Sequence, residues 1–240
     1  MNIFDFDDVL DSALDELVAQ GWAQCDDFLP APLVRELAAQ CHQRQAQGLL
    51  ARAGVGRGKD QLVQASVRGD SIQWLEPGMS TAVDTYLAAM DTVREALNRS
   101  LYLGLVDYEC HFALYPPGAF YKKHVDRFRD DDRREISAVL YLNEHWSVAD
   151  GGALRLHLPD QQSLDIAPVS GRLLLFRSAQ MLHEVLPAGR ERGSLTGWSR
   201  RRGEGVLGRC RKSSSVAVCS ARRCAMTAAV MGPSRCCRTG

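Results

Sequence analysis

The chain has 240 residues, which is enough for one sizeable domain with an appendage. Hydrophobic residues make up 45% of the sequence and charged residues 24%, so the chain can bury a core and keep a polar surface. No apolar run approaches the length of a membrane helix, and the acidic start, with Asp5, Asp7 and Asp8, differs from a basic and apolar secretory signal. We therefore expect a cytoplasmic protein with no membrane attachment.

Charge and cysteine are unevenly distributed along the chain. Seven of the 29 basic residues, one of the 29 acidic residues and five of the eight cysteines follow Arg202. The rest of the chain is therefore acidic, which argues against a nucleic-acid partner. Residues 203–240 show no sustained apolar period, and their cysteine spacings match no common zinc module. We expect this segment to be a basic, Cys-rich and disordered tail.

The first hundred residues are predicted to be mainly helical. Apolar residues recur with helical spacing in Phe6–Val18, Leu33–Ala46 and Ser80–Tyr102, and we interpret the three stripes as core contacts. The glycine- and charge-rich stretch Gly48–Lys59 predicts an exposed, mobile loop. We assign residues 1–104 to an N-terminal helical support region.

From Val106 onward the sequence predicts short strands separated by proline and glycine turns. Closely spaced strands after a helical half indicate an α+β fold, in which a double-stranded β-helix (jelly roll) occupies residues 105–202 and the N-terminal helices support it. The eight expected strands are Tyr108–Leu114, Phe120–Val125, Ser137–Leu142, Ala153–Leu158, Ser163–Ile166, Leu173–Phe176, Leu182–Leu186 and Ser194–Ser199.

A metal site is indicated at the end of one of these strands. His124 and Asp126 are two positions apart, so strand alternation directs both side chains the same way. His183 follows 57 residues after Asp126, on a later strand. Two imidazoles and one carboxylate form the facial triad that leaves half of an octahedral Fe(II) open, for a chelating 2-oxo acid and O2. A bare His-x-Asp motif is weak evidence, because chance supplies many.

Arg192 strengthens the prediction, nine positions after His183. A buried guanidinium can bind a distal carboxylate through two parallel hydrogen bonds. An arginine taken out of context is most often a solvated surface residue. Arg192 instead begins the strand-like segment Ser194–Trp198, which must return into the barrel.

Taken together, these motifs resemble the prolyl-hydroxylase branch of the 2-oxoglutarate/Fe(II) oxygenases. That branch includes the oxygen-sensing hydroxylases of animals and their bacterial relatives. The matching motifs are Cys25–Leu29, Arg68–Trp74, Tyr115–Pro116, Tyr121–Asp126, Tyr141–Asn143, Gly151–Leu156, His183–Val185 and Arg192–Trp198.

The resemblance implies a role for nine residues. His124, Asp126 and His183 match the iron ligands. The remaining matches are Arg192 and Tyr141 on the C5 carboxylate of 2-oxoglutarate, Tyr115 near its metal-bound end, Leu154 and Thr196 in the pocket wall, and Trp198 beside the substrate proline. Leu154 and Thr196 are equally well interpreted as ordinary core residues of a strand.

The same resemblance implies the reaction. Fe(II), 2-oxoglutarate and O2 are expected to hydroxylate a prolyl residue of a protein substrate, with release of succinate and CO2 and with ascorbate (vitamin C) as reductant. The segment Ala51–Ser66 matches a mobile substrate-facing loop. Two alternatives stay open, a hydroxylase of a small molecule or free amino acid and a non-catalytic metal-binding jelly roll. Nothing in the sequence indicates the oligomeric state.

Overall fold

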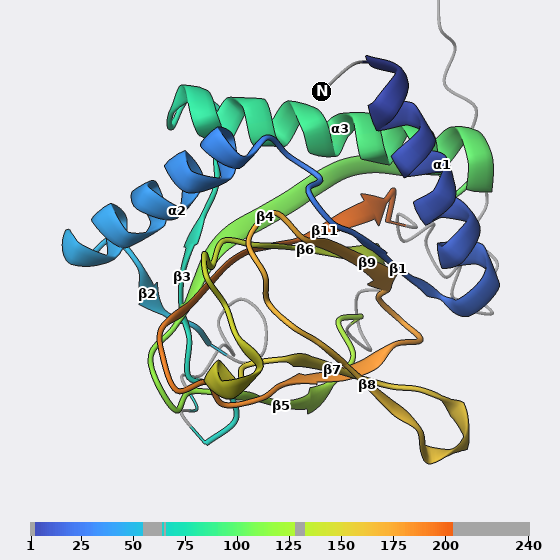
Figure 1. Cartoon of the computed structure of the whole chain (residues 1–240). Coiled ribbons are helices and arrows are strands. Elements are labelled where there is room, and N and C mark those ends of the chain that lie inside the picture. Colours follow the sequence, from blue (N-terminus) through green and yellow to red (C-terminus); the bar gives the residue numbers. More distant parts are fainter. Residues whose placement is uncertain (1–2, 55–63, 65, 128–132, 204–240) are drawn as a thin grey trace, which may run out of the picture. The chain divides into compact units, whose positions relative to one another are not determined.

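The computed structural model describes residues 3–54, 64, 66–127 and 133–203. Three helices, α1 (Ile3–Gln20), α2 (Ala31–Ala46) and α3 (Thr81–Leu101), confirm the three that the apolar stripes predict (Figure 1). Local chemistry sets where they begin. Pro30 and Pro32 flank the start of α2, and the Ser80 hydroxyl accepts a hydrogen bond from the Val83 amide, 3.2 Å away, at the start of α3.

The strands form two antiparallel sheets. The major sheet has the order β1-β9-β6-β11-β4-β3-β2 and the minor sheet the order β5-β10-β7-β8. This two-sheet arrangement, with helices preceding it in the chain, is the expected α+β jelly roll. The strands are β1 (Trp22–Cys25), β2 (Ala51–Arg52), β3 (Ser71–Trp74), β4 (Leu105–Tyr115), β5 (Tyr121–His124), β6 (Arg134–Tyr141), β7 (Leu154–His157), β8 (Ser163–Ile166), β9 (Leu173–Arg177), β10 (Leu182–Val185) and β11 (Arg192–Arg201).

All eight expected strands are present as β4 to β11, whereas β1, β2 and β3 were not expected. Each of these three has four residues or fewer and lies among the predicted helices, outside the run of closely spaced strands and turns that begins at Val106. β1 extends the major sheet beside β9, and β3 pairs with β4 so that Trp74 lies opposite His111. The N-terminal third of the chain therefore contributes strands as well as helices to the β-structure.

Strand alternation in β4 separates two layers of buried side chains. Cys110, Phe112 and Leu114 face the helices and belong to the largest hydrophobic core. Ala113 and Tyr115 face the opposite way and pack in a small cluster with Val185 of the minor sheet. Figure 1 shows the helices over one face of the major sheet and β5, β7 and β8 across the other. The space between the two sheets is where the candidate site residues lie.

Two expectations fall largely outside the described residues. The predicted tail lies there almost entirely, since only residue 203 of it is described. Most of the segment Ala51–Ser66 lies there too, apart from Ala51–Gly54, Gln64 and Ser66. Among the described helices, none has the length and apolar character required to cross a membrane.

Candidate metal centre and co-substrate pocket

A cavity of about 310 Å³ lies between the two sheets, and it collects almost all of the residues singled out from the sequence. Tyr141 does not line the cavity, whereas Arg192 does. The Tyr141 ring nevertheless lies 5.1 Å from the guanidinium carbon of Arg192. The predicted residues that line the cavity are Tyr115, His124, Asp126, Leu154, His183, Arg192, Thr196 and Trp198.

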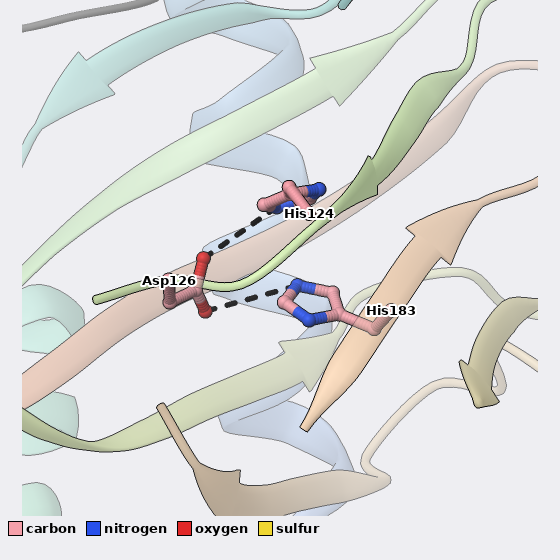
Figure 2. A group of neighbouring side chains, drawn as sticks. All are labelled: His124, Asp126 and His183. Atoms are coloured by element: carbon pink, nitrogen blue, oxygen red, sulfur yellow. Dashed lines mark ion pairs between the residues drawn. The ribbon is translucent and has the colours of Figure 1, made fainter. Parts of the chain in front are cut away.

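His124, Asp126 and His183 form a compact group of potential metal ligands. Each offers a ligand atom, and these atoms all lie within 4.8 Å of one another. Antiparallel pairing of β5 with β10 places the two histidines opposite each other. The carboxylate of Asp126 lies 3.5 Å from Nε2 of His124 and 3.8 Å from Nε2 of His183 (Figure 2). Residues far apart in sequence are thus brought together as predicted.

The backbone fixes which nitrogen of each histidine faces the site. Nδ1 of His124 lies 2.6 Å from the Lys122 carbonyl, and Nδ1 of His183 lies 3.0 Å from the Met181 carbonyl. A carbonyl only accepts, so each Nδ1 carries a proton, and Nε2 is the nitrogen that faces the site. Hydrogen bonds of this kind orient histidines that bind metals. Burial also lowers the pKa of His183, which favours its neutral, ligating form.

Asp126 supplies the negative charge. Burial alone would raise the pKa of its carboxyl group, but the positive charge that His183 and His124 can carry and a hydrogen bond from Ser137 outweigh burial and hold the pKa well below its usual range. The carboxyl group is therefore ionised. One carboxylate and two imidazoles, all aimed at one point, are a donor set for a divalent transition metal.

Arg192 and Tyr141 present unused hydrogen-bonding atoms in a buried position. Arg192 is 1% exposed, and its Nε donates to the Gly152 carbonyl at 2.9 Å. Its Nη2 and the Tyr141 hydroxyl are buried with no hydrogen-bond partner. No carboxylate among the described residues pairs with Arg192. A buried cation next to an unpartnered hydroxyl fits the carboxylate of a bound molecule, because such groups are rarely left unsatisfied.

One ligand histidine is further held by a stack of side chains. The Tyr121 ring lies 3.6 Å from the His124 ring. The Arg68 guanidinium lies 4.5 Å from the centre of the Tyr121 ring and also forms an ion pair with Asp70. Arg68 and Asp70 therefore have a structural role.

Two further aromatic side chains, to which the sequence assigned no role, adjoin Trp198. The His111 ring lies 5.1 Å from Trp74 and 5.6 Å from Trp198. Burial lowers the pKa of His111 to about 4, so it is neutral at neutral pH. Trp74 is 46% exposed and lines the cavity as well. Counting back from Tyr115 by twos would have placed His111 on the cavity face.

A chain of ion pairs was missed as well. Arg134 lies over the Trp198 ring at 3.5 Å and donates to Glu109 at 2.9 Å. Glu109 also accepts from Arg200 at 2.6 Å, and Arg200 makes two further bonds to Asp107, both of 2.8 Å. These residues come from three strands, and their charges alone give no sign that they meet.

Comparison with known proteins agrees with this geometry. A family model described as the 2OG-Fe(II) oxygenase superfamily matches residues 110–200. A prolyl-4-hydroxylase from Pseudomonas putida is 57% identical, with a TM-score of 0.76, over 80% of this chain and 100% of that one. A prolyl hydroxylase from Trichoplax adhaerens, solved with a peptide fragment of a hypoxia inducible factor oxygen degradation domain, is 26% identical, with a TM-score of 0.74, over 82% of this chain and 91% of that one.

A curated relative is similar over most of this chain as well. The hypoxia-inducible factor prolyl hydroxylase of Caenorhabditis elegans is 28% identical over an alignment of 220 residues that covers 85% of this chain. This chain spans only 30% of the length of that relative. The Pseudomonas structure, by contrast, is matched over its whole length at high identity. The chain therefore belongs to the 2OG-Fe(II) oxygenase superfamily, in its prolyl 4-hydroxylase branch.

Proposed function

We propose that this chain is an Fe(II)- and 2-oxoglutarate-dependent dioxygenase that hydroxylates a prolyl residue of a peptide or protein. One observation carries the proposal: a His-Asp-His ligand group shares a single cavity with a buried arginine that pairs with no carboxylate of the described residues. The prolyl hydroxylases to which the chain is similar support the choice of a prolyl substrate.

His124, Asp126 and His183 would hold the metal. Their free Nε2 atoms and ionised carboxylate suit Fe(II), and three protein ligands leave positions open for other molecules. Bound Fe(II) supplies the chemistry in which O2 and 2-oxoglutarate become one hydroxyl group on the substrate, succinate and CO2. The protein holds the ligands, orients the reactants and excludes water from the cavity.

Arg192 and Tyr141 would bind the distal carboxylate of 2-oxoglutarate. Nη2 of Arg192 and the hydroxyl of Tyr141 are two of the buried atoms that have no hydrogen-bond partner among the described residues, and both can donate to an anion. Tyr115, whose ring lies 5.2 Å from the Arg192 guanidinium, would stand beside the same molecule. Leu154 and Thr196 would complete the walls of the pocket.

The substrate proline would lie against Trp198, in the part of the cavity that Trp74 and Val125 also line. Trp74 and Val125 are 46% and 42% exposed, so this side offers apolar surface to a peptide. We assign the segment Ala51–Ser66 to covering the bound peptide. Ascorbate would serve as the reductant that keeps the metal as Fe(II). Cys25, Cys41 and Cys110 are free thiols, as in proteins of a reducing compartment, and on this ground we place the enzyme in the cytoplasm.

The test is turnover started by oxygen. Protein loaded anaerobically with Fe(II) and 2-oxoglutarate is mixed with prolyl peptides or with free proline, O2 is added, and succinate and hydroxylated product are quantified. We expect product from peptides, none from His124→Ala, and full activity from His157→Ala, a matched histidine that pairs with Glu184 outside the triad. Product from free proline alone would move the assignment to a small-molecule hydroxylase. No succinate under any condition would refute the enzyme assignment.

A further inference from the structure

Ser178 joins the two segments that carry the metal ligands. β5 ends at His124, so the backbone of Asp126 lies beyond the last strand pairing. The amides of Asp126 and Arg127 instead both donate to the Ser178 carbonyl, at 3.1 and 3.2 Å. Ser178 directly follows β9, five residues before His183, and its own amide donates to the Glu135 carbonyl at 3.0 Å. One residue thus fixes the turn that carries Asp126 relative to the segment that leads to His183.

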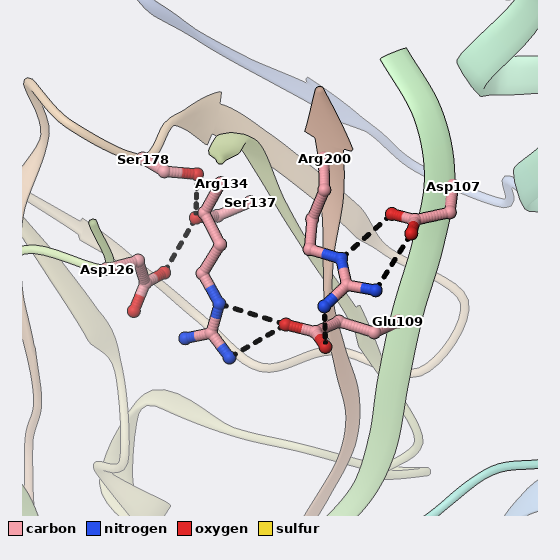
Figure 3. A network of polar contacts seen from close by, with 7 residues as sticks. All are labelled: Asp107, Glu109, Asp126, Arg134, Ser137, Ser178 and Arg200. Atoms are coloured by element: carbon pink, nitrogen blue, oxygen red, sulfur yellow. Dashed lines mark hydrogen bonds and ion pairs between the residues drawn. The ribbon is translucent and has the colours of Figure 1, made fainter. Parts of the chain in front are cut away.

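A chain of two hydroxyl groups reaches the Asp126 carboxylate from the same residue. Oγ of Ser137, on β6, donates to Oδ2 of Asp126 at 2.6 Å and lies 2.8 Å from Oγ of Ser178 (Figure 3). A carboxylate only accepts hydrogen bonds, so the single Ser137 proton is used on Asp126. Ser137 must then accept from Ser178. The direction of the chain is therefore from Ser178 to Ser137 to Asp126.

The position of these hydroxyls indicates what they do. Both serines are 0% exposed, so solvent does not compete for their bonds. A buried hydroxyl is costly unless it is hydrogen-bonded, and the neighbours of Ser137 in β6 are the apolar Ile136 and Ala138. An apolar residue would suit a buried strand equally well. Among the described residues, the charged group to which Ser137 is hydrogen-bonded is the carboxylate of the triad.

We propose that Ser137 and Ser178 are positioning residues that set the orientation of the Asp126 carboxylate toward the metal. The inference rests on the proposed metal site. Ser137 occupies Oδ2 and limits rotation of the carboxylate, while the Ser178 carbonyl holds its backbone. Hydrogen bonds in series polarise one another, so the Ser178 hydroxyl strengthens the bond that Ser137 makes. Loss of either hydroxyl therefore weakens metal binding, and loss of the Ser137 hydroxyl weakens it more.

Metal affinity tests this directly and needs neither co-substrate nor turnover. The full chain and its variants are titrated with Mn(II), a redox-stable substitute for Fe(II), and free Mn(II) is measured by electron paramagnetic resonance. We expect the Kd of Ser137→Ala to rise about 10- to 100-fold, the range for partners that orient metal ligands. Ser178→Ala should rise less, and Ser137→Thr, which keeps the hydroxyl, should stay near the wild-type value.

Ser199→Ala is the matched control, because Ser199 is a buried serine of β11 outside the chain of hydroxyls. It should bind Mn(II) like the wild type, even if it is less stable. Thermal unfolding without metal shows which variants fold. If Ser137→Ala does not fold, the Mn(II) affinities of Ser178→Ala and Ser137→Thr test the positioning role. The absorption bands of bound Co(II) should shift in Ser137→Ala and not in Ser199→Ala.

The outcomes separate the two proposals. Wild-type protein that fails to bind Mn(II) would overturn the metal site and this inference together. Wild-type protein that binds Mn(II), with the same Kd in the folded Ser137→Ala and Ser178→Ala variants, would overturn this inference alone. A Ser137→Thr variant as weak as Ser137→Ala would also contradict it, because the hydroxyl would then not be what matters.

Discussion

Replacing Arg192 with methionine should weaken co-substrate binding without destabilising the protein. Methionine has a similar length and no charge, so Arg192→Met fills the space and removes the guanidinium. In the structure this guanidinium is buried, makes one hydrogen bond to Gly152 and pairs with no carboxylate of the described chain. Replacing an ordinary structural arginine would instead lower the stability of the protein, because its removal would break an ion pair.

The magnitudes follow from that environment. An uncompensated buried charge costs several kcal/mol. Contacts of the guanidinium with the Tyr115 and Tyr141 rings, worth about 2 kcal/mol each at most, offset this cost only in part. The free energy of unfolding without ligand should therefore stay equal or rise by up to about 3 kcal/mol. Removing one partner of a buried, hydrogen-bonded charge pair costs about 2 to 5 kcal/mol. The Kd of Arg192→Met for 2-oxoglutarate should therefore be higher than that of wild type by a factor between about 30 and several thousand.

Two measurements on the same samples show whether Arg192 binds the co-substrate or stabilises the fold. Urea denaturation of the ligand-free protein gives stability, and calorimetric titration of 2-oxoglutarate in the presence of Mn(II) gives affinity. Arg172→Met is the control, since Arg172 is ion-paired with Asp26 and does not line the cavity. It should leave the affinity unchanged. An affinity of Arg192→Met within about threefold of wild type, with stability lowered, would refute the reasoning.

Three further predictions concern neighbouring residues. Tyr141→Phe removes one hydroxyl from the carboxylate site and should raise the Kd for 2-oxoglutarate about 10-fold or more by calorimetry, with peptide affinity unchanged. Glu109→Gln weakens the hold on Arg134 over Trp198, so steady-state kinetics should show a several-fold higher KM for peptide, while the 2-oxoglutarate Kd stays constant. Burial lowers the pKa of His111 to about 4, so as pH falls below about 6.5 the unfolded chain binds a proton that the folded chain does not. In urea denaturation, the free energy of unfolding of His111→Met relative to wild type should increase from pH 7 to pH 4.5, by on the order of 3 kcal/mol at most. An equal difference between the two proteins at both pH values would contradict this.

The sequence predicted helices and long strands that show a period, and short strands that follow one another closely between proline and glycine turns. Strands such as β4 and β11 have ten or more residues, and their alternation is visible in one dimension. β2 has two residues and exists because β3 is beside it, a pairing that no local pattern records. The metal ligands were accessible for a different reason. Fe(II) requires particular donor types, and His124 and Asp126 are close enough in sequence to form a motif.

The supporting residues could not be found in the same way. Ser137 and Ser178 are 41 residues apart and are chemically unremarkable in the sequence. They matter because β6 and β9 pair, with Ser137 opposite Phe176, and this brings the end of β9 to Asp126. The contact of Glu109 with Arg134 and Arg200 likewise depends on three strands that meet in one sheet. Such contacts follow from tertiary pairing and not from residue type or spacing.

Isotope labelling tests the central claim most directly. The enzyme is supplied with ¹⁸O₂, Fe(II), 2-oxoglutarate and a prolyl peptide, and the labels in peptide and succinate are read by mass spectrometry. The account predicts one labelled oxygen in the hydroxylated prolyl residue and one in succinate, in equal amounts, and neither product from His124→Ala. A hydroxyl oxygen derived from water from the outset, or labelled succinate that never accompanies peptide hydroxylation, would contradict it.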